Sequence, residues 1–416
     1  DLNGRYIFVK DCEGGVCAAK GFYAAGVHAG VKASSAPDKK DLMLIYSAEP
    51  CNACGMYTKN QVKAASVLLT MEHLQNGRAQ AVVANSGNAN ACAPNGEENA
   101  RRMCAAAAAA IGCAPEDVLV SSTGVIGQTL NVQVIENGIP ELCRTLVHSA
   151  EGSDAAAHAI MTTDTVKKEA AVETSIGGKI VRIGGIAKGS GMIHPNMGTM
   201  LCFLTTDCDI SSEMIREALL EVTRVSFNRI SVDGDTSTND TCLVLANGLA
   251  GNPSITSQGA DYDAFLEALR ALCVEMARRI AADGEGAKHM ITCTVEGATD
   301  EAQAERIAKS VISSTLTKAA IFGADANWGR VLCAMGYSGE AFDPDKVDVS
   351  FISAAGSVAV CAQGRGLDFD EEAAKRILTE HDVTIAVAMG EGNGACTCWG
   401  CDITYDYIKI NGDYRT

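Results

Sequence analysis

The sequence is poor in proline and in aromatic side chains, and it has no long apolar run. Only 8 of its 416 residues are Pro, and aromatic residues make up 5% of the chain. No apolar stretch approaches the ~20 residues that a membrane-spanning helix needs, so we expect no membrane segment. The first residues also lack the basic and apolar regions of a signal peptide, which predicts a cytoplasmic location.

Positive charge is scarce as well. Lys and Arg total 34 against 51 Asp and Glu, which gives a formal net charge of −17. Because binding to nucleic-acid phosphates requires clustered Lys and Arg, this balance argues against a nucleic-acid partner. An anionic small-molecule substrate remains compatible with the composition, since a few local positive groups decide its binding.

The common catalytic signatures are missing. The sequence has no Gly-x-Ser-x-Gly elbow, no Walker loop and no His-Glu-x-x-His motif. The glycine pair Gly189/Gly191 does not complete a dinucleotide-binding pattern. The 7 His residues are scattered, and His194, which precedes a Pro, is more typical of a loop residue than of a base. A His-dependent triad therefore has poor support.

What is abundant is small and apolar. Hydrophobic residues make up 47% of the chain, and Ala and Gly are frequent, which favours tightly packed layers of helices and strands. The expected elements do not alternate in strict βαβ order, so the predicted class is α+β. They include strands at 41–47, 66–70, 79–84, 117–121, 179–186, 200–206 and 242–246, helices at 97–111, 131–150 with a break at Pro140, 211–228 and 262–283, and a strand-like segment at 397–410.

Cysteine is also abundant, with 18 residues spread through Ala- and Val-rich segments. We expect reduced, buried thiols rather than disulfides. Two Cys-x-x-Cys pairs, Cys51/Cys54 and Cys398/Cys401, could bind zinc together in a scaffold protein, but they are far apart in sequence.

The acidic segment 231–241 has the spacing of a calcium-binding loop, but the glycine and the closing Glu of that pattern are misplaced. We therefore favour a hydrogen-bonded loop there. The expected metal content is none.

The candidate chemistry lies in residues 187–207, where a Gly-rich loop runs into an apolar strand. Thr199 follows Gly198 at this junction. Gly198 leaves its own carbonyl open to attack, and the start of a strand fixes the Thr hydroxyl. Cleavage of the bond between them would give Thr199 a free α-amine with a pKa of about 7.7–8.0, which suits a general base at neutral pH. The residues alone leave open whether Thr199 is a nucleophile or a β-forming residue at a strand edge.

Eight motifs carry a resemblance to a known family: NSGNANAC, SSTGVIG, MTTDT, KGSGMIHPNMGTML, DGDTSTNDT, GEGA, FGADANWGR and the terminal NGDYRT. Together they resemble the glutamate N-acetyltransferase/ornithine acetyltransferase family of arginine biosynthesis, over about residues 20–416. The resemblance implies a layered α/β/β/α-type sandwich with a smaller C-terminal α/β region. It also implies autocatalytic cleavage into an α chain (1–198) and a β chain (199–416), assembled as an α2β2 heterotetramer. The family usually has Ala before the Thr, where this sequence has Gly198.

The resemblance further implies ping-pong acetyl transfer from N2-acetylornithine to glutamate through an ester on Thr199. It assigns the oxyanion hole to Thr123 and Gly124, and the substrate contacts to Thr162, Lys188, Thr199, Glu285, Asn411 and Thr416. Lys188 suits the substrate carboxylate, and Glu285 suits the ornithine ammonium. No cofactor is implied, and acetyl-CoA stays open as a co-substrate. The alternative is a self-processing amidase or aminopeptidase, in which water replaces glutamate.

Overall fold

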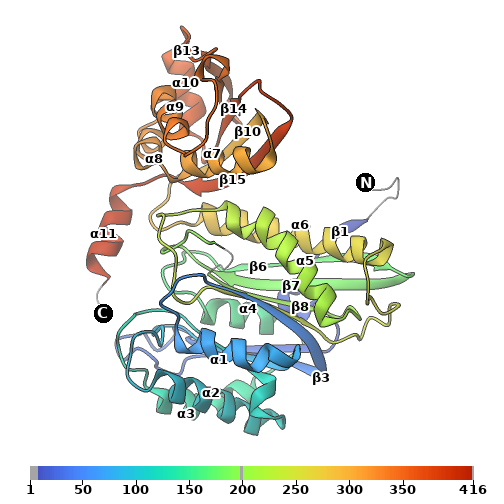
Figure 1. Ribbon diagram of the computed structural model, residues 1–416. Helices are drawn as coiled ribbons and strands as arrows, with labels where there is room; N and C mark the ends of the chain where they lie inside the picture. Colours follow the sequence, from blue (N-terminus) through green and yellow to red (C-terminus); the bar gives the residue numbers. More distant parts are fainter. Residues whose placement is uncertain (1–7, 197–199, 415–416) are drawn as a thin grey trace.

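The computed structural model describes residues 8–196 and 200–414. A larger lobe is built on a nine-stranded sheet and a smaller C-terminal lobe on a six-stranded sheet (Figure 1), counted over those residues. In the larger sheet the order is β1-β6-β7-β8-β9-β3-β4-β5, with β2 paired to β3. Its strands are β1 (Val9–Cys12), β2 (Phe22–Val27), β3 (Leu42–Tyr57), β4 (Arg78–Asn85), β5 (Val118–Ser122), β6 (Lys168–Ile176), β7 (Lys179–Lys188), β8 (Leu201–Thr206) and β9 (Thr241–Ala246).

The long strand β3 passes from one layer of the larger lobe to another. Its first half pairs with β2 and β4, its second half pairs with β9, and the register shifts between Tyr46 and Cys51. Side chains that alternate along β3 point to opposite faces. Met43 and Ile45 therefore join a core shared with Phe203 and Leu245 of the β8–β9 layer, between the two β layers.

Helices cover the two outer faces. Helices α5 (Ser212–Val225) and α6 (Ala260–Ala282) pack on the β6–β9 layer, where Ile183 and Leu204 join their core. Helices α1 (Ala65–His73), α2 (Gly96–Ile111) and α3 (Val132–Arg144) cover the β2–β5 layer, and α4 (Ala150–Ala159) contributes to the middle core. The layering α/β/β/α predicted by the resemblance is confirmed.

The smaller lobe has a hydrophobic core of its own. Its strands are β10 (Met290–Ala298), β11 (Asp348–Ser353), β12 (Gly356–Ala362), β13 (Arg365–Gly366), β14 (Asp382–Ala388) and β15 (Gly394–Cys401), and its helices are α7 (Glu301–Ser313), α8 (Thr315–Phe322), α9 (Trp328–Gly336) and α10 (Glu371–Thr379). Helix α11 (Tyr405–Asp413) leaves this lobe and runs back beside the larger one (Figure 1).

Three expected elements are wrong. Residues 66–70 belong to helix α1 instead of a strand, because a short apolar run fits a buried helix as well as a strand. Pro140 lies inside α3 without ending it, since Ile135, Ile139 and Leu142 bury one face of the helix on both sides of the proline. The expected strand at 397–410 stops at Cys401, and Thr404 then caps α11 by accepting a 3.3 Å hydrogen bond from Tyr407 N.

The predicted cleavage bond between Gly198 and Thr199 lies outside the described residues, but its flanks are β7 and β8. These strands are antiparallel neighbours in the larger sheet, with Lys188 opposite Leu201. On its other side β8 pairs with β9, which pairs in turn with β3. The predicted boundary therefore runs through one sheet, and strands of segment 199–416 lie between strands of segment 1–198. Within the described ranges, no helix combines the length and the apolarity needed to cross a bilayer.

Candidate functional site

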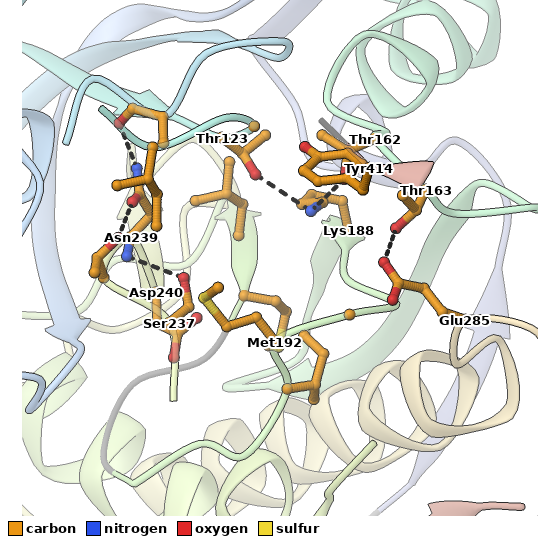
Figure 2. A pocket seen from close by; sticks show the side chains of 18 of the residues that line it. Thr123, Thr162, Thr163, Lys188, Met192, Ser237, Asn239, Asp240, Glu285 and Tyr414 are labelled. Atoms are coloured by element: carbon orange, nitrogen blue, oxygen red, sulfur yellow. Dashed lines mark hydrogen bonds between the residues drawn. The ribbon is translucent and has the colours of Figure 1, made fainter. Parts of the chain in front are cut away.

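A pocket opens beside the junction of β7, β8 and β9 in the larger lobe (Figure 2). It has a volume of about 130 Å³ and is lined by residues from distant parts of the chain. The polar lining comprises Thr123, Thr162, Thr163, Lys188, Ser237, Thr238, Asn239, Asp240, Glu285, Asn411 and Tyr414. In the view of Figure 2, Lys188 lies between Thr123 and Thr162, with Glu285 on one side and Asp240 on the other.

Lys188, the last residue of β7, supplies the cation of the pocket. Its ammonium donates hydrogen bonds to Thr162 Oγ1 at 2.8 Å and to Thr123 Oγ1 at 3.2 Å. Burial lowers the pKa of Lys188, and the nearby Asp164 carboxylate opposes this effect. An ammonium has three N–H groups. One therefore remains that no described residue accepts, and it can bind a carboxylate or carbonyl oxygen of a ligand.

A buried ion cluster holds the segments around Lys188 together. Lys168 is 0% exposed, and its ammonium lies 2.7 Å from Asp164 Oδ1 and 2.6 Å from Asp283 Oδ2. Asp164 Oδ1 also accepts a 2.8 Å hydrogen bond from Gly189 N. Burial would raise the pKa of Asp164, but the charges of Lys188 and Lys168 lower it below its usual value. The cluster thus ties the loop after α4 to the end of β7 and to the C-terminal end of α6.

Glu285 follows α6 and presents a carboxylate to the pocket. Its Oε1 accepts a 2.7 Å hydrogen bond from Thr163 Oγ1, and its Oε2 accepts one of 2.6 Å from Asn411 Nδ2. A Cβ added at Gly191 would lie 2.2 Å from Glu285 Oε1, so only glycine leaves room for this carboxylate. Glu285 thus presents its carboxylate to the pocket, where it suits a ligand ammonium.

The turn after β5 places Thr123 and Gly124 at the pocket wall. The backbone N–H of Thr123 donates a 3.0 Å hydrogen bond to Asn85 O, so this N–H is not available to an anion. Its hydroxyl oxygen accepts from Lys188, which leaves the hydroxyl hydrogen to donate into the pocket. Gly124 has φ +134°, and a Cβ there would lie 2.4 Å from the backbone carbon of Gly87. Thr123 can therefore offer its hydroxyl to an anion beside the backbone of Gly124.

Of the residues predicted as site residues, six line this one pocket: Thr123, Gly124, Thr162, Lys188, Glu285 and Asn411. The other three, Gly198, Thr199 and Thr416, lie outside the described residues. Met200, which follows Thr199 in the sequence, lines the pocket, and so does Tyr414 near the C-terminus.

Sequence reasoning missed Asp240 and Tyr414 as pocket residues. Asp240 was included only in the loop 231–241, which is indeed hydrogen-bonded: Asn239 Nδ2 donates to Ala89 O and to Ser122 O, both at 2.7 Å. The only sequence feature that could have indicated Asp240 as a pocket residue is its position directly before an apolar strand. Tyr414 has a half-exposed ring that receives the Lys32 ammonium 5.8 Å from its centroid, and nothing in the sequence pairs these two residues.

The structure does not bring the two Cys-x-x-Cys pairs together. Cys51 lies in the middle core of the larger lobe, whereas Cys398 lies in the core of the smaller lobe. All 18 Cys are free thiols. In the part of the chain that the structure describes, no group of three or more His, Cys, Asp or Glu side chains is arranged to hold a metal ion.

Comparison with known proteins gives one consistent family. The ArgJ family profile matches residues 23–416. The arginine biosynthesis bifunctional protein ArgJ of Symbiobacterium thermophilum is 52% identical over 404 residues, which cover 97% of this chain and 99% of that protein. ArgJ 1 of Clostridium acetobutylicum is 50% identical over 396 residues, covering 95% and 96%. A solved structure of ornithine acetyltransferase complexed with ornithine, from Mycobacterium tuberculosis, is 40% identical with a TM-score of 0.42, covering 45% of this chain and 99% of that one.

Proposed function

This chain belongs to the ArgJ family, and we propose that its pocket moves an acetyl group from N2-acetylornithine to glutamate, giving ornithine and N-acetylglutamate. The observation that carries the proposal is the pairing of Lys188 and Glu285 in one pocket. A buried cation and a buried carboxylate recognise a molecule that has both a carboxylate and an ammonium group, as acetylornithine does.

Lys188 suits both substrates. Acetylornithine and glutamate each carry an α-carboxylate, which the third N–H of the Lys188 ammonium can bind. Glu285 then selects the donor, because ornithine has a side-chain ammonium and glutamate does not. The exchange of one amino acid for the other at a single site is what a ping-pong reaction requires.

Thr199 is the proposed nucleophile of this reaction. Its hydroxyl attacks the acetyl carbonyl and passes its proton to the α-amine of Thr199, and the Thr123 hydroxyl and the Gly124 N–H stabilise the resulting oxyanion. The C–N bond breaks, ornithine leaves, and an acetyl ester remains on Thr199 until the glutamate amine attacks it. The position of Met200 at the pocket supports this assignment, because Thr199 is its neighbour in sequence.

The free α-amine requires that the chain be cut, so we propose autocatalytic cleavage between Gly198 and Thr199. The sheet topology supports it, because both resulting fragments contribute strands to one sheet and remain paired through β7–β8 and β9–β3. The proposal extends to assembly as α2β2 and to a cytoplasmic location. The 18 free thiols suit a reducing compartment.

A substrate-dependence assay tests the function. The purified protein is incubated with acetylornithine, with and without glutamate, and free ornithine is measured over time. Sustained ornithine release should require glutamate, with N-acetylglutamate formed in equal amount. Ornithine release at the same rate without glutamate would mean that water is the acceptor and would contradict the transferase. A third incubation with acetyl-CoA and glutamate tests our further proposal that acetyl-CoA also serves as a donor.

A further inference from the structure

Asp240 is a second carboxyl group in the pocket, at the wall away from Glu285 in the view of Figure 2. It precedes β9 and is 1% exposed. The next residue, Thr241, donates its backbone N–H to Met200 O at 2.8 Å. The parallel register of β8 and β9 therefore sets Asp240 level with Met200, at the start of the strand that follows the predicted nucleophile.

The carboxyl groups of Glu285 and Asp240 differ in their hydrogen bonds. Both oxygens of Glu285 accept hydrogen bonds, from Thr163 and Asn411. By contrast, Asp240 Oδ1 is buried and has no hydrogen-bond partner among the described residues. A buried polar atom without a partner is costly, so such an atom at a pocket wall indicates a ligand that completes it.

The surroundings of Asp240 also favour its neutral form. Burial raises the pKa of its carboxyl well above the ordinary value, while the charge of Lys188 and a hydrogen bond with Ser237 act in the opposite direction. The other titratable side chains that line the pocket are Lys188, Glu285 and Tyr414. A carboxyl with a raised pKa keeps its proton to higher pH than an ordinary exposed Asp, so it can serve as a proton donor where that Asp cannot.

We propose that Asp240 is the general acid of the acetyl transfer, giving its proton to the amine that leaves and taking one from the amine that enters. This inference rests on the proposed function. Acetylornithine is an amide, and an amine leaves a tetrahedral intermediate readily only when its nitrogen is protonated. The Thr199 ammonium formed in the attack keeps its proton for the Thr199 oxygen in the second half of the reaction, and the Asp240 carboxyl supplies the proton for the leaving nitrogen.

The protons balance over the two halves of the reaction. In the first half the Thr199 hydroxyl proton moves to the Thr199 amine, and the Asp240 proton moves to the leaving nitrogen as the C–N bond breaks. Ornithine departs as the amine, and Asp240 becomes a carboxylate that faces the charge of Lys188. In the second half the glutamate amine forms the new C–N bond and returns one N–H proton to Asp240. The ester C–O bond breaks, and the Thr199 oxygen recovers its proton from its own ammonium.

The test compares two acetyl donors on wild-type protein and on Asp240→Asn. One donor is acetylornithine, whose nitrogen must be protonated to leave. The other is p-nitrophenyl acetate, whose phenolate leaves without a proton. Formation of the acetyl-enzyme is followed by intact mass spectrometry in both cases. Asp240→Asn should acetylate from acetylornithine ~10²–10⁴-fold more slowly, while its rate from p-nitrophenyl acetate should stay within about threefold of wild type. Asp368→Asn, which removes an exposed carboxyl in the smaller lobe, serves as the matched control.

Equal losses with both donors, or no loss with either, would overturn the assignment of Asp240. If wild-type protein forms no acetyl-enzyme with acetylornithine, the proposed function itself fails, which separates the two outcomes. A measurement on wild type alone keeps the test valid if Asp240→Asn does not fold. The rate from acetylornithine should fall as the pH rises through the raised pKa of Asp240, and the rate from p-nitrophenyl acetate should not. A fall in both rates over the same pH range, or in neither, would overturn the inference.

Discussion

Gly191 lies against the carboxylate of Glu285 so closely that a methyl group added at Gly191 would be 2.2 Å from Glu285 Oε1. The carboxylate cannot move away from residue 191 without losing its hydrogen bonds to Thr163 and Asn411. The absence of a side chain at residue 191 is thus a condition for the placement of the group that we expect to bind the ornithine ammonium.

Gly191→Ala should therefore lower kcat/KM for acetylornithine by about tenfold or more, since a displaced charged hydrogen-bond partner costs about 1.5–3 kcal/mol. Steady-state kinetics with acetylornithine as the varied substrate measure the effect. Gly336→Ala is the matched control, because a Cβ at Gly336, at the end of α9, meets nothing within 4 Å. Unchanged kinetics in Gly191→Ala would show that the placement of the Glu285 carboxylate does not depend on a glycine at residue 191.

Removal of the pocket cation should weaken recognition of the substrate carboxylate. Lys188→Met keeps the length of the side chain but loses the ammonium, so KM for acetylornithine should rise by about ten- to a hundredfold. The loss should be smaller for N-acetylputrescine, an acetyl donor without an α-carboxylate. Lys375→Met, which alters an exposed lysine on α10, is the control. A loss of the same size for both donors would show that Lys188 does not bind the carboxylate.

The buried ion cluster gives a prediction for stability. Lys168→Met leaves Asp164 and Asp283 buried without their cation, which should lower the free energy of unfolding by about 3–5 kcal/mol. The neighbouring Lys167 pairs with Asp154 and Glu169 but is about one-third exposed, so Lys167→Met should cost at most about 1 kcal/mol. Urea denaturation of both variants tests the contrast, and similar losses would contradict a special role for the buried cation.

Asp164 makes that stability depend on pH. Its pKa is lowered in the folded protein by the charges of Lys188 and Lys168, against the raising effect of burial, whereas the unfolded chain has an Asp pKa of about 3.9. The stabilisation is therefore complete above about pH 4 and is lost as the pH falls toward the lowered value. Asp164→Asn should be less stable than wild type at pH 7, and the gap should narrow in strongly acid solution. A gap that stays constant with pH would contradict the lowered pKa.

The predictable part of the fold is the part with strong local patterns. The stripe Phe265, Leu269 and Leu272 predicts α6 directly, and the apolar run 200–206 predicts β8. Helix α1 could not be distinguished from a strand by periodicity over five residues. Helix α11 has no buried side chain, so it carries no apolar stripe that would indicate it in the sequence.

The candidate site likewise has residues that could be predicted from the sequence and residues that could not. Lys188, Glu285 and the Thr123–Gly124 turn could be named because each lies in a motif of the family. The Lys168–Asp283 ion pair could not, since its members are 115 residues apart in the chain and neither is distinctive alone. Asp240 stands in a motif crowded with polar residues, several of them buried, and only its unpartnered oxygen distinguishes it from its neighbours.

The central claim is that Thr199 is both the point of cleavage and the residue that carries the acetyl group. Intact mass spectrometry of wild-type protein and of Thr199→Ala, before and after incubation with acetylornithine, tests both parts together. Wild type should give two fragments that meet between Gly198 and Thr199, and only the fragment that begins with Thr199 should gain one acetyl group. Thr199→Ala should remain one chain without acetyl. Two fragments or an acetylated product from Thr199→Ala would contradict the account.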